Sequence, residues 1–99
     1  GLMEATDIKQ LDSFKAGMLF ARAEGIIPAP ESCHAIAAAI NEAELCKETG
    51  QEKVILFNLS GHGLIDMTAY DQYLSGSLYN YELTDEDVQK NLDSIEKYV

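Results

Sequence analysis

The residues best suited to chemistry form a polar, glycine-rich turn that follows an apolar run directly. The run is Val54–Phe57, and the turn reads Asn58-Leu59-Ser60-Gly61-His62-Gly63. Four consecutive large apolar residues without alternation are typical of a strand buried on both faces of a parallel sheet. Open α/β sheets bind ligands at the carboxyl ends of such strands. We therefore expect Ser60 to present a ligand-binding hydroxyl on this turn.

Ser60 has two other candidate roles. A nucleophilic serine on such a turn needs the pattern Gly-x-Ser-x-Gly, and position 58 is Asn. The hydroxyl would alternatively satisfy the backbone of its own turn. His62 on the same turn has two roles of equal weight, contact with an anionic ligand or exposure to solvent.

Glu31 and His34 form a second candidate pair, because a spacing of three places both on one helix face. Such a pair can bind metal in helical bundles, but one pair alone is weak, and a packed, hydrogen-bonded histidine is favoured. Cys33 and Cys46 have neither metal-ligand spacing nor a disulfide framework. They are predicted to be small apolar fillers in a reduced setting, and no metal site is predicted.

Helices are expected to position these residues. Apolar spacing predicts a first helix that starts at a capping box formed by Asp7 and Gln10 and stops at Gly25. Gly17 in this helix is expected to allow close packing against a neighbouring element. A second helix is expected over residues 31–48, with Ser32 as its candidate cap and Gly50 as its stop. A short third helix is expected over residues 66–73. A last helix is expected to begin after Thr84, with an apolar face formed by Val88, Leu92, Ile95 and Val99. Thr84 and Asp87 form an approximate capping box.

Length and charge limit the function classes. The chain has 99 residues, with 17 acidic and 7 basic side chains and a net charge of -10. This is the length of one small domain. Its acidity disfavours nucleic acids and acidic membranes as partners. With no spanning segment and no signal peptide, a cytoplasmic protein is expected. One confident strand cannot form a stable sheet, so the sequence reads as an α/β slice of a larger domain.

Two segments resemble the tryptophan synthase β subunit. Residues 24–36 are similar to its Glu-Gly-Ile-Ile-Pro-Ala-x-Glu-Ser-x-His-Ala segment, and residues 58–63 to its Asn-Leu-Ser-Gly-x-Gly turn. Pro30, His62 and the acidic tail resemble the longer, archaeal-style type of this subunit. The resemblance covers residues 1–76 and points to the C-terminal part of the enzyme. Residues 77–99 would then be an acidic helical extension.

The resemblance implies a piece of a fold-type-II pyridoxal-phosphate enzyme. The expected fold class is α/β, an incomplete piece of a three-layer αβα domain, mostly helical with one or two parallel strands. The implied reaction is β-replacement, in which L-serine and indole give L-tryptophan and water. Family members carry the Schiff-base lysine and the phosphate-binding loop upstream of this segment, so the chain should hold no catalytic residue and be inactive alone.

Implied site residues follow from the same motifs. Ser60 would hydrogen-bond the pyridine nitrogen of pyridoxal 5'-phosphate, and Glu31 would line its ring. Gly61 and Gly63 would shape the turn below the ring. The surrounding positions are His34, His62 and Asn58, and His62 stands where the better-known bacterial form has Arg.

The resemblance also implies partners. These are the rest of the β chain, a second β chain in a homodimer, and an α subunit as a further candidate. Two alternatives stay open. One is another fold-type-II lyase that uses serine or threonine. The other is a standalone acidic interaction or oligomerisation module that associates through its last helix.

Overall fold

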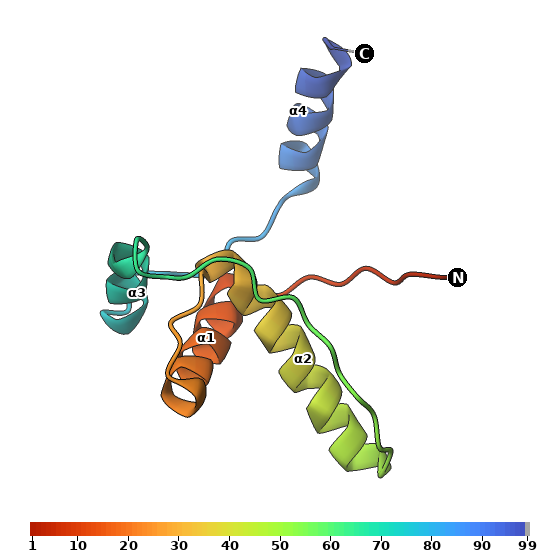
Figure 1. Ribbon diagram of the computed structural model, residues 1–99. Helices are drawn as coiled ribbons and strands as arrows, with labels where there is room; N and C mark the ends of the chain where they lie inside the picture. The colour runs from red at the N-terminus through yellow and green to blue at the C-terminus, as the bar shows by residue number, and fades with distance from the viewer. Residues whose placement is uncertain (99) are drawn as a thin grey trace.

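A computed structural model describes residues 1–98 of the chain. Its helices are α1 (Gln10–Glu24), α2 (Pro30–Thr49), α3 (Met67–Leu74) and α4 (Asp85–Glu96). Figure 1 shows that α1 and α2 diverge from one end like the arms of a V, with α3 beside α1 and α4 standing apart. The expectation of a mostly helical chain is confirmed.

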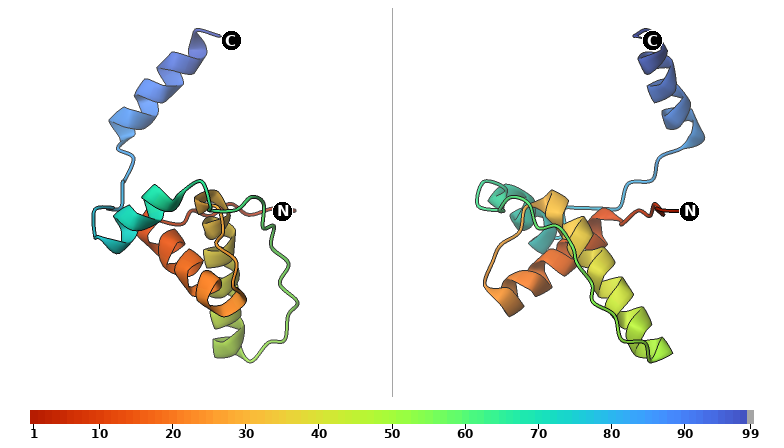
Figure 2. Two further views of the ribbon diagram at one scale, coloured as in Figure 1. Left: turned by 60° about the vertical axis from the view of Figure 1, so that its left-hand side comes forward. Right: turned by 45° about the vertical axis from the view of Figure 1, so that its right-hand side comes forward.

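Small residues let α1 and α2 pack closely. Ser13, Ala16 and Gly17 of α1 are buried, as are Cys33 and Ala37 of α2. Because none of these side chains is longer than a thiol, the two backbones can approach with little between them. The resulting contact, seen from two further sides in Figure 2, holds the first turn of α2 in place.

The buried residues form two clusters on either side of this contact. One consists of Phe14, Cys33 and Tyr70, and so joins α1, α2 and α3. The other consists of Ala16, Ile36 and Ala37. The rings of Phe14 and Tyr70 lie edge to face at a centroid distance of 5.2 Å. This is a favourable arrangement for two aromatic side chains.

Glycines end the first two helices as predicted. Gly25 and Gly50 both have a positive φ, in the left-handed region that residues with a Cβ rarely adopt. Their N–H groups donate to Ala21 O and Cys46 O respectively, which satisfies the last carbonyls of each helix. The capping box of α4 is also confirmed, because Thr84 Oγ1 accepts from the Asp87 N–H and Asp87 accepts from the Thr84 N–H.

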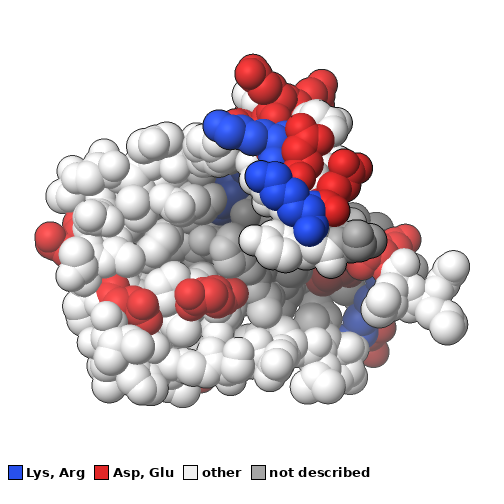
Figure 3. Space-filling view, turned by 90° about the horizontal axis from the view of Figure 1, so that it is seen from above, with Lys and Arg blue, Asp and Glu red and all other residues white. Residues whose placement is uncertain are grey.

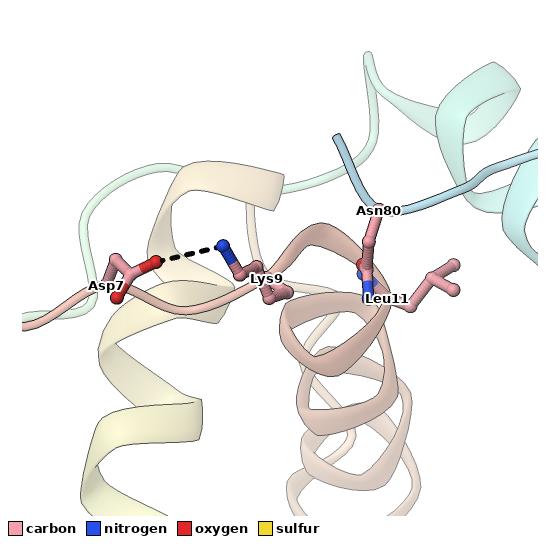
Figure 4. Close-up of polar contacts among 4 residues, drawn as sticks. All are labelled: Asp7, Lys9, Leu11 and Asn80. Carbon is pink, nitrogen blue, oxygen red and sulfur yellow. Dashed lines mark hydrogen bonds and ion pairs between the residues drawn. The ribbon is translucent and has the colours of Figure 1, made fainter. Parts of the chain in front are cut away.

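The predicted start of α1 is wrong. The helix begins at Gln10, and the Asp7 carboxylate instead pairs with Lys9 at 3.4 Å (Figure 4). The cap comes from far away in the sequence, since the Leu11 N–H donates to Asn80 Oδ1 at 2.9 Å. This contact ties the segment before α4 to the start of α1.

The predicted strand is wrong as well. Residues 51–60 are extended, but within residues 1–98 they pair with no other strand, and the only bridge joins Pro28 to His62. Side chains along the segment alternate: Phe57 and Leu59 pack against the Ala16–Ile36–Ala37 cluster, whereas Val54 and Leu56 are 100% and 95% exposed. The period of two is that of a strand, and what is missing is a neighbour. One or two parallel strands are therefore not observed.

Helix α4 projects away from the other helices (Figures 1 and 2). None of its described residues is buried. Seen from above in Figure 3, charged side chains gather on this projection, while most of the surrounding surface is uncharged. Among residues 1–98, no helix combines the length and apolar character needed to span a membrane.

Candidate functional site

The two motifs singled out from the sequence lie against each other. Pro28, in the loop before α2, forms an antiparallel bridge with His62 of the glycine-rich turn. The Gly63 N–H donates to Ile27 O at 2.8 Å. Residues far apart in the sequence therefore form one local structure at the start of α2.

A buried serine joins the turn to the helix. The Ser32 hydroxyl, in the first turn of α2, donates to the Ser60 carbonyl oxygen. The prediction that Ser32 caps its own helix is wrong, since α2 begins at Pro30 after an Ala29 N-cap. The hydrogen bond places the Ser60 backbone beside the turn that carries Glu31. Both Ser60 and Glu31 are exposed and free to meet a ligand.

Gly63 is required for the close approach of turn and loop. A Cβ at this position would lie 2.6 Å from Pro28 O and 2.9 Å from Tyr70 Cε2, both shorter than van der Waals contact. Gly61 has a φ of 76°, and a Cβ there would lie 3.3 Å from Ala29 Cβ. The turn therefore has this shape because positions 61 and 63 carry no side chain.

Tyr70 supports the site, although the sequence predicts for it only a general packing role. Its hydroxyl donates to Pro28 O and lies 3.4 Å from Cys33 Sγ. Cys33 Sγ in turn donates to Ala29 O at 3.4 Å. Nothing in the spacing of these residues links α3 to the loop, so no local pattern could have found the contact. Cys33 is a filler as predicted, because its thiol is fully buried.

Burial keeps both groups neutral. It raises the pKa of the Cys33 thiol, an effect that its polar contact with the Tyr70 hydroxyl partly offsets. Burial also raises the pKa of Tyr70, and the Cys33 hydrogen bond acts in the same direction. Raised pKa values mean that the folded chain binds these protons more tightly than the unfolded chain. Their contribution to stability is therefore full at neutral pH and is lost as the pH rises into the alkaline range.

Substitution of Tyr70 by Phe tests this support, because the buried Pro28 carbonyl then loses its donor. We expect it to lower the free energy of unfolding by about 1–3 kcal/mol. Tyr73→Phe is the matched control, since the Tyr73 ring stacks on Phe14 and is only half-buried. Urea denaturation of both variants gives the comparison, and equal stabilities would contradict the role of the Tyr70 hydroxyl.

The remaining candidates separate into two places. Glu31 and His34 line a cleft of about 690 Å³ together with residues of segments 7–14 and 81–83. Ser60, Gly61 and Gly63 do not line this cleft. His62 is exposed, and its Nδ1 accepts from the Leu64 N–H at 3.3 Å, while Asn58 is also exposed. Within residues 1–98, no three His, Cys, Asp or Glu side chains are grouped as a metal site would require.

Comparison with known proteins identifies the segment, although no family model matches the chain. It is 64% identical over 78 residues to the tryptophan synthase beta chain 2 of Aquifex aeolicus, and 62% identical over 78 residues to that of Methanosarcina acetivorans. It is 52% identical over 82 residues to the tryptophan synthase beta chain of Thermococcus onnurineus.

These matches cover 79–83% of the chain but 18% of each relative. The chain thus spans less than a fifth of the length of the proteins it matches. At 52–64% identity, the resemblance carried by residues 24–36 and 58–63 is confirmed. Over about four fifths of its length, this chain is the counterpart of one segment of the tryptophan synthase beta chain.

Proposed function

We propose that the chain is the C-terminal part of a tryptophan synthase β chain and supplies one wall of its pyridoxal-phosphate site. Residues 1–76 would belong to the cofactor domain and residues 77–99 to an acidic helical extension. The observation that carries the proposal is the contact between the two family motifs, in which Ser32 holds Ser60 and Gly63 sits against Ile27 and Pro28.

The residues present fit this cofactor. A pyridine nitrogen needs one neutral partner, and Ser60 is exposed on a turn whose backbone is held by the Ser32 hydroxyl. Glycines at 61 and 63 let the turn lie directly against Pro28, Ala29 and Tyr70, which fixes the position of Ser60. Glu31 stands in the first helical turn of α2, where the helix dipole favours a carboxylate. When bound, the cofactor would supply the electron sink for replacement of the serine hydroxyl group by indole.

Within this site, Ser60 would set the electronic character of the ring. A hydroxyl can hydrogen-bond the pyridine nitrogen without giving up its proton, which moderates electron withdrawal and favours elimination and replacement. Glu31 would place its charge beside the ring, and Gly61 and Gly63 would keep the turn close beneath it. The positions of His34, His62 and Asn58 around this wall stay predictions.

The extended segment explains how this piece would complete a larger domain. Val54 and Leu56 expose one apolar face, and both edges of residues 51–60 lack strand partners within the described chain. We propose that the rest of the β chain covers this face and pairs with it in a three-layer αβα domain. The same part would supply the Schiff-base lysine and the phosphate loop, so the chain is inactive alone.

Ser60→Ala in the complete β chain tests the proposal. We expect a shifted cofactor absorption spectrum and an altered ratio of tryptophan formation to side reactions with serine. One lost hydrogen bond of about 1 kcal/mol corresponds to a change of roughly fivefold in that ratio. Ser77→Ala, on an exposed turn after α3, is the control.

Two results would count against this function. An unchanged spectrum with unchanged turnover would remove Ser60 from the site. Activity with serine or threonine but none with serine plus indole would favour another fold-type-II lyase.

Association of the β chain with a second copy and with an α subunit belongs to the same proposal and is tested by the mass of the purified protein.

A further inference from the structure

The Ser32 hydroxyl holds Ser60 by its backbone and not by its side chain. Ser32 is 4% exposed, and its hydroxyl donates to the Ser60 carbonyl oxygen across 28 positions of the chain. The bond leaves the exposed hydroxyl of Ser60 available to a ligand. Because both partners belong to this chain and Ser32 is buried, the contact does not depend on what the rest of a longer protein covers.

The peptide unit between Ser60 and Gly61 is the one that this bond orients. Its carbonyl belongs to Ser60, so the bond limits rotation of the whole unit. Gly61 has a φ of 76°, and glycine adopts positive and negative φ about equally well. A glycine at position 61 therefore does not choose between two orientations of this peptide. The hydrogen bond from Ser32 makes that choice.

Other contacts fix the later half of the turn. The Gly63 N–H donates to Ile27 O at 2.8 Å, and His62 forms the bridge with Pro28. Both contacts lie beyond Gly61, so rotation at the glycine separates them from Ser60. They hold the turn against the loop, whereas the Ser32 bond controls the direction in which Ser60 leaves the backbone.

Helix α2 gives Ser32 a rigid support. Cys33, Ile36 and Ala37, which follow it, are 0%, 3% and 6% exposed and are clustered with residues of α1. Groups that act on a ligand must be held to within about 0.5 Å, and a packed helix holds them more precisely than a loop does. Through Ser32, the precision of α2 is passed to a serine that itself lies on a turn.

We propose that Ser32 is a positioning residue for Ser60 and acts by selecting one orientation of the Ser60–Gly61 peptide. The inference rests on the proposed function, in which the Ser60 hydroxyl hydrogen-bonds the pyridine nitrogen of the cofactor. Ser32 touches neither cofactor nor substrate. Loss of its hydroxyl weakens the Ser60 contact, because a hydrogen bond loses strength when its angle is distorted, and so changes the electronic character of the ring.

Ser32→Ala and Ser60→Ala in the complete β chain, singly and together, test this role. Titration of the cofactor-free protein with pyridoxal 5'-phosphate gives the dissociation constant, and the absorption spectrum of the loaded protein reports on the ring. We expect Ser32→Ala to shift the spectrum in the same direction as Ser60→Ala. It should raise the dissociation constant by about threefold to tenfold, the range for one hydrogen bond. In the Ser60→Ala background, Ser32→Ala should change neither quantity further, since it acts through the Ser60 hydroxyl.

Two further variants separate this hydrogen bond from other effects. Thr49→Val removes a hydroxyl that donates to Leu45 O at 2.9 Å at the opposite end of α2, and it should leave both quantities unchanged. Ser32→Cys fills nearly the same space but carries only a weak donor, so it should shift the spectrum as Ser32→Ala does. A spectrum that Ser32→Cys leaves unchanged, beside a shift with Ser32→Ala, would overturn the proposal, because packing would then position Ser60.

The remaining outcomes distinguish this inference from the function on which it rests. A spectrum that changes with Ser60→Ala but not with Ser32→Ala would overturn the role of Ser32 alone. Additive effects of the two changes would also overturn it, because Ser32 would then act independently of Ser60. A spectrum and dissociation constant that Ser60→Ala leaves unchanged would overturn the proposed function together with this inference.

Discussion

Gly63→Ala is expected to lower the free energy of unfolding by about 2–3 kcal/mol, the upper range for overpacking a close contact. The new Cβ would meet Pro28 O at 2.6 Å, Ile27 Cγ2 at 2.8 Å and Tyr70 Cε2 at 2.9 Å. Side chains can turn away, but the Pro28 carbonyl belongs to the backbone and already accepts from Tyr70. The turn must therefore separate from the loop. Chemical denaturation of this variant measures the effect.

The control separates this clash from backbone strain. A Cβ on Gly25 meets no atom within 4 Å, but the φ of this residue is positive. An alanine in that conformation costs roughly 1–2 kcal/mol. Only Gly63→Ala should also change the near-ultraviolet circular dichroism of the Tyr70 environment.

The same substitution has an expected effect on the cofactor. In the complete β chain, Gly63→Ala should weaken cofactor binding, because it displaces Ser60, whereas Gly25→Ala should not. Ordinary surface substitutions change the free energy of unfolding by no more than about 0.5 kcal/mol. If Gly63→Ala had so small an effect, the turn and the loop would not be in contact.

The second large effect is a coupling between Gly17 and Cys33. A Cβ on Gly17 would overlap Cys33 Sγ, whereas Cys33 Cβ would lie at 3.5 Å, an ordinary contact that remains after Cys33→Ala. Gly17→Ala alone should lower the free energy of unfolding by about 1–3 kcal/mol through overpacking. Because the double variant lacks the sulfur, its loss of unfolding free energy should be smaller than the summed losses of the two single variants by about 1–3 kcal/mol. Denaturation of all four proteins completes the cycle.

Cys46 provides the matched control for this cycle. It lies near the other end of α2 and is only half-buried. Gly17→Ala and Cys46→Ala should therefore act additively, within about 0.5 kcal/mol. If the effects of Gly17→Ala and Cys33→Ala on stability were also additive, α1 and α2 would be farther apart than described.

Features set by neighbouring residues could be predicted from the sequence. Helices α1, α2 and α4 follow from apolar spacing, and α3 follows from Asp66 as a candidate cap. The stops of α1 and α2 at Gly25 and Gly50 follow from the freedom of glycine, and the start of α4 follows from Thr84 and Asp87. Each of these depends on atoms within about one helical turn. The close packing of Gly17 is also confirmed, since Cys33 occupies the space that a side chain would need.

Features set by distant residues could not be predicted in this way. Local spacing predicts that Ser32 caps α2, but the Ser60 carbonyl takes its hydrogen bond from 28 positions away. The start of α1 depends on Asn80, which is 69 positions from Leu11. Residues 54–57 have the composition of a buried strand, yet a strand needs neighbours that residues 1–98 do not provide.

The candidate site shows the same division. The glycine-rich turn can be recognised from its composition. Its contact with residues 25–30 is consistent with the expectation that the two motifs belong to one site. The contribution of Tyr70 could not be foreseen, because its hydroxyl reaches Pro28 across 42 positions. Roles for Ser60 and Glu31 come from the resemblance and stay predictions until the complete β chain is tested.

The alternation along residues 51–60 also bears on fibril formation. Val54–Leu59 contains no proline, glycine or charge, and its side chains already point to two opposite faces. An extended segment of this kind, with open backbone edges, is a template for cross-β stacking of identical chains. We therefore expect the part of the protein that covers Val54 and Leu56 to protect this segment from cross-β stacking as well.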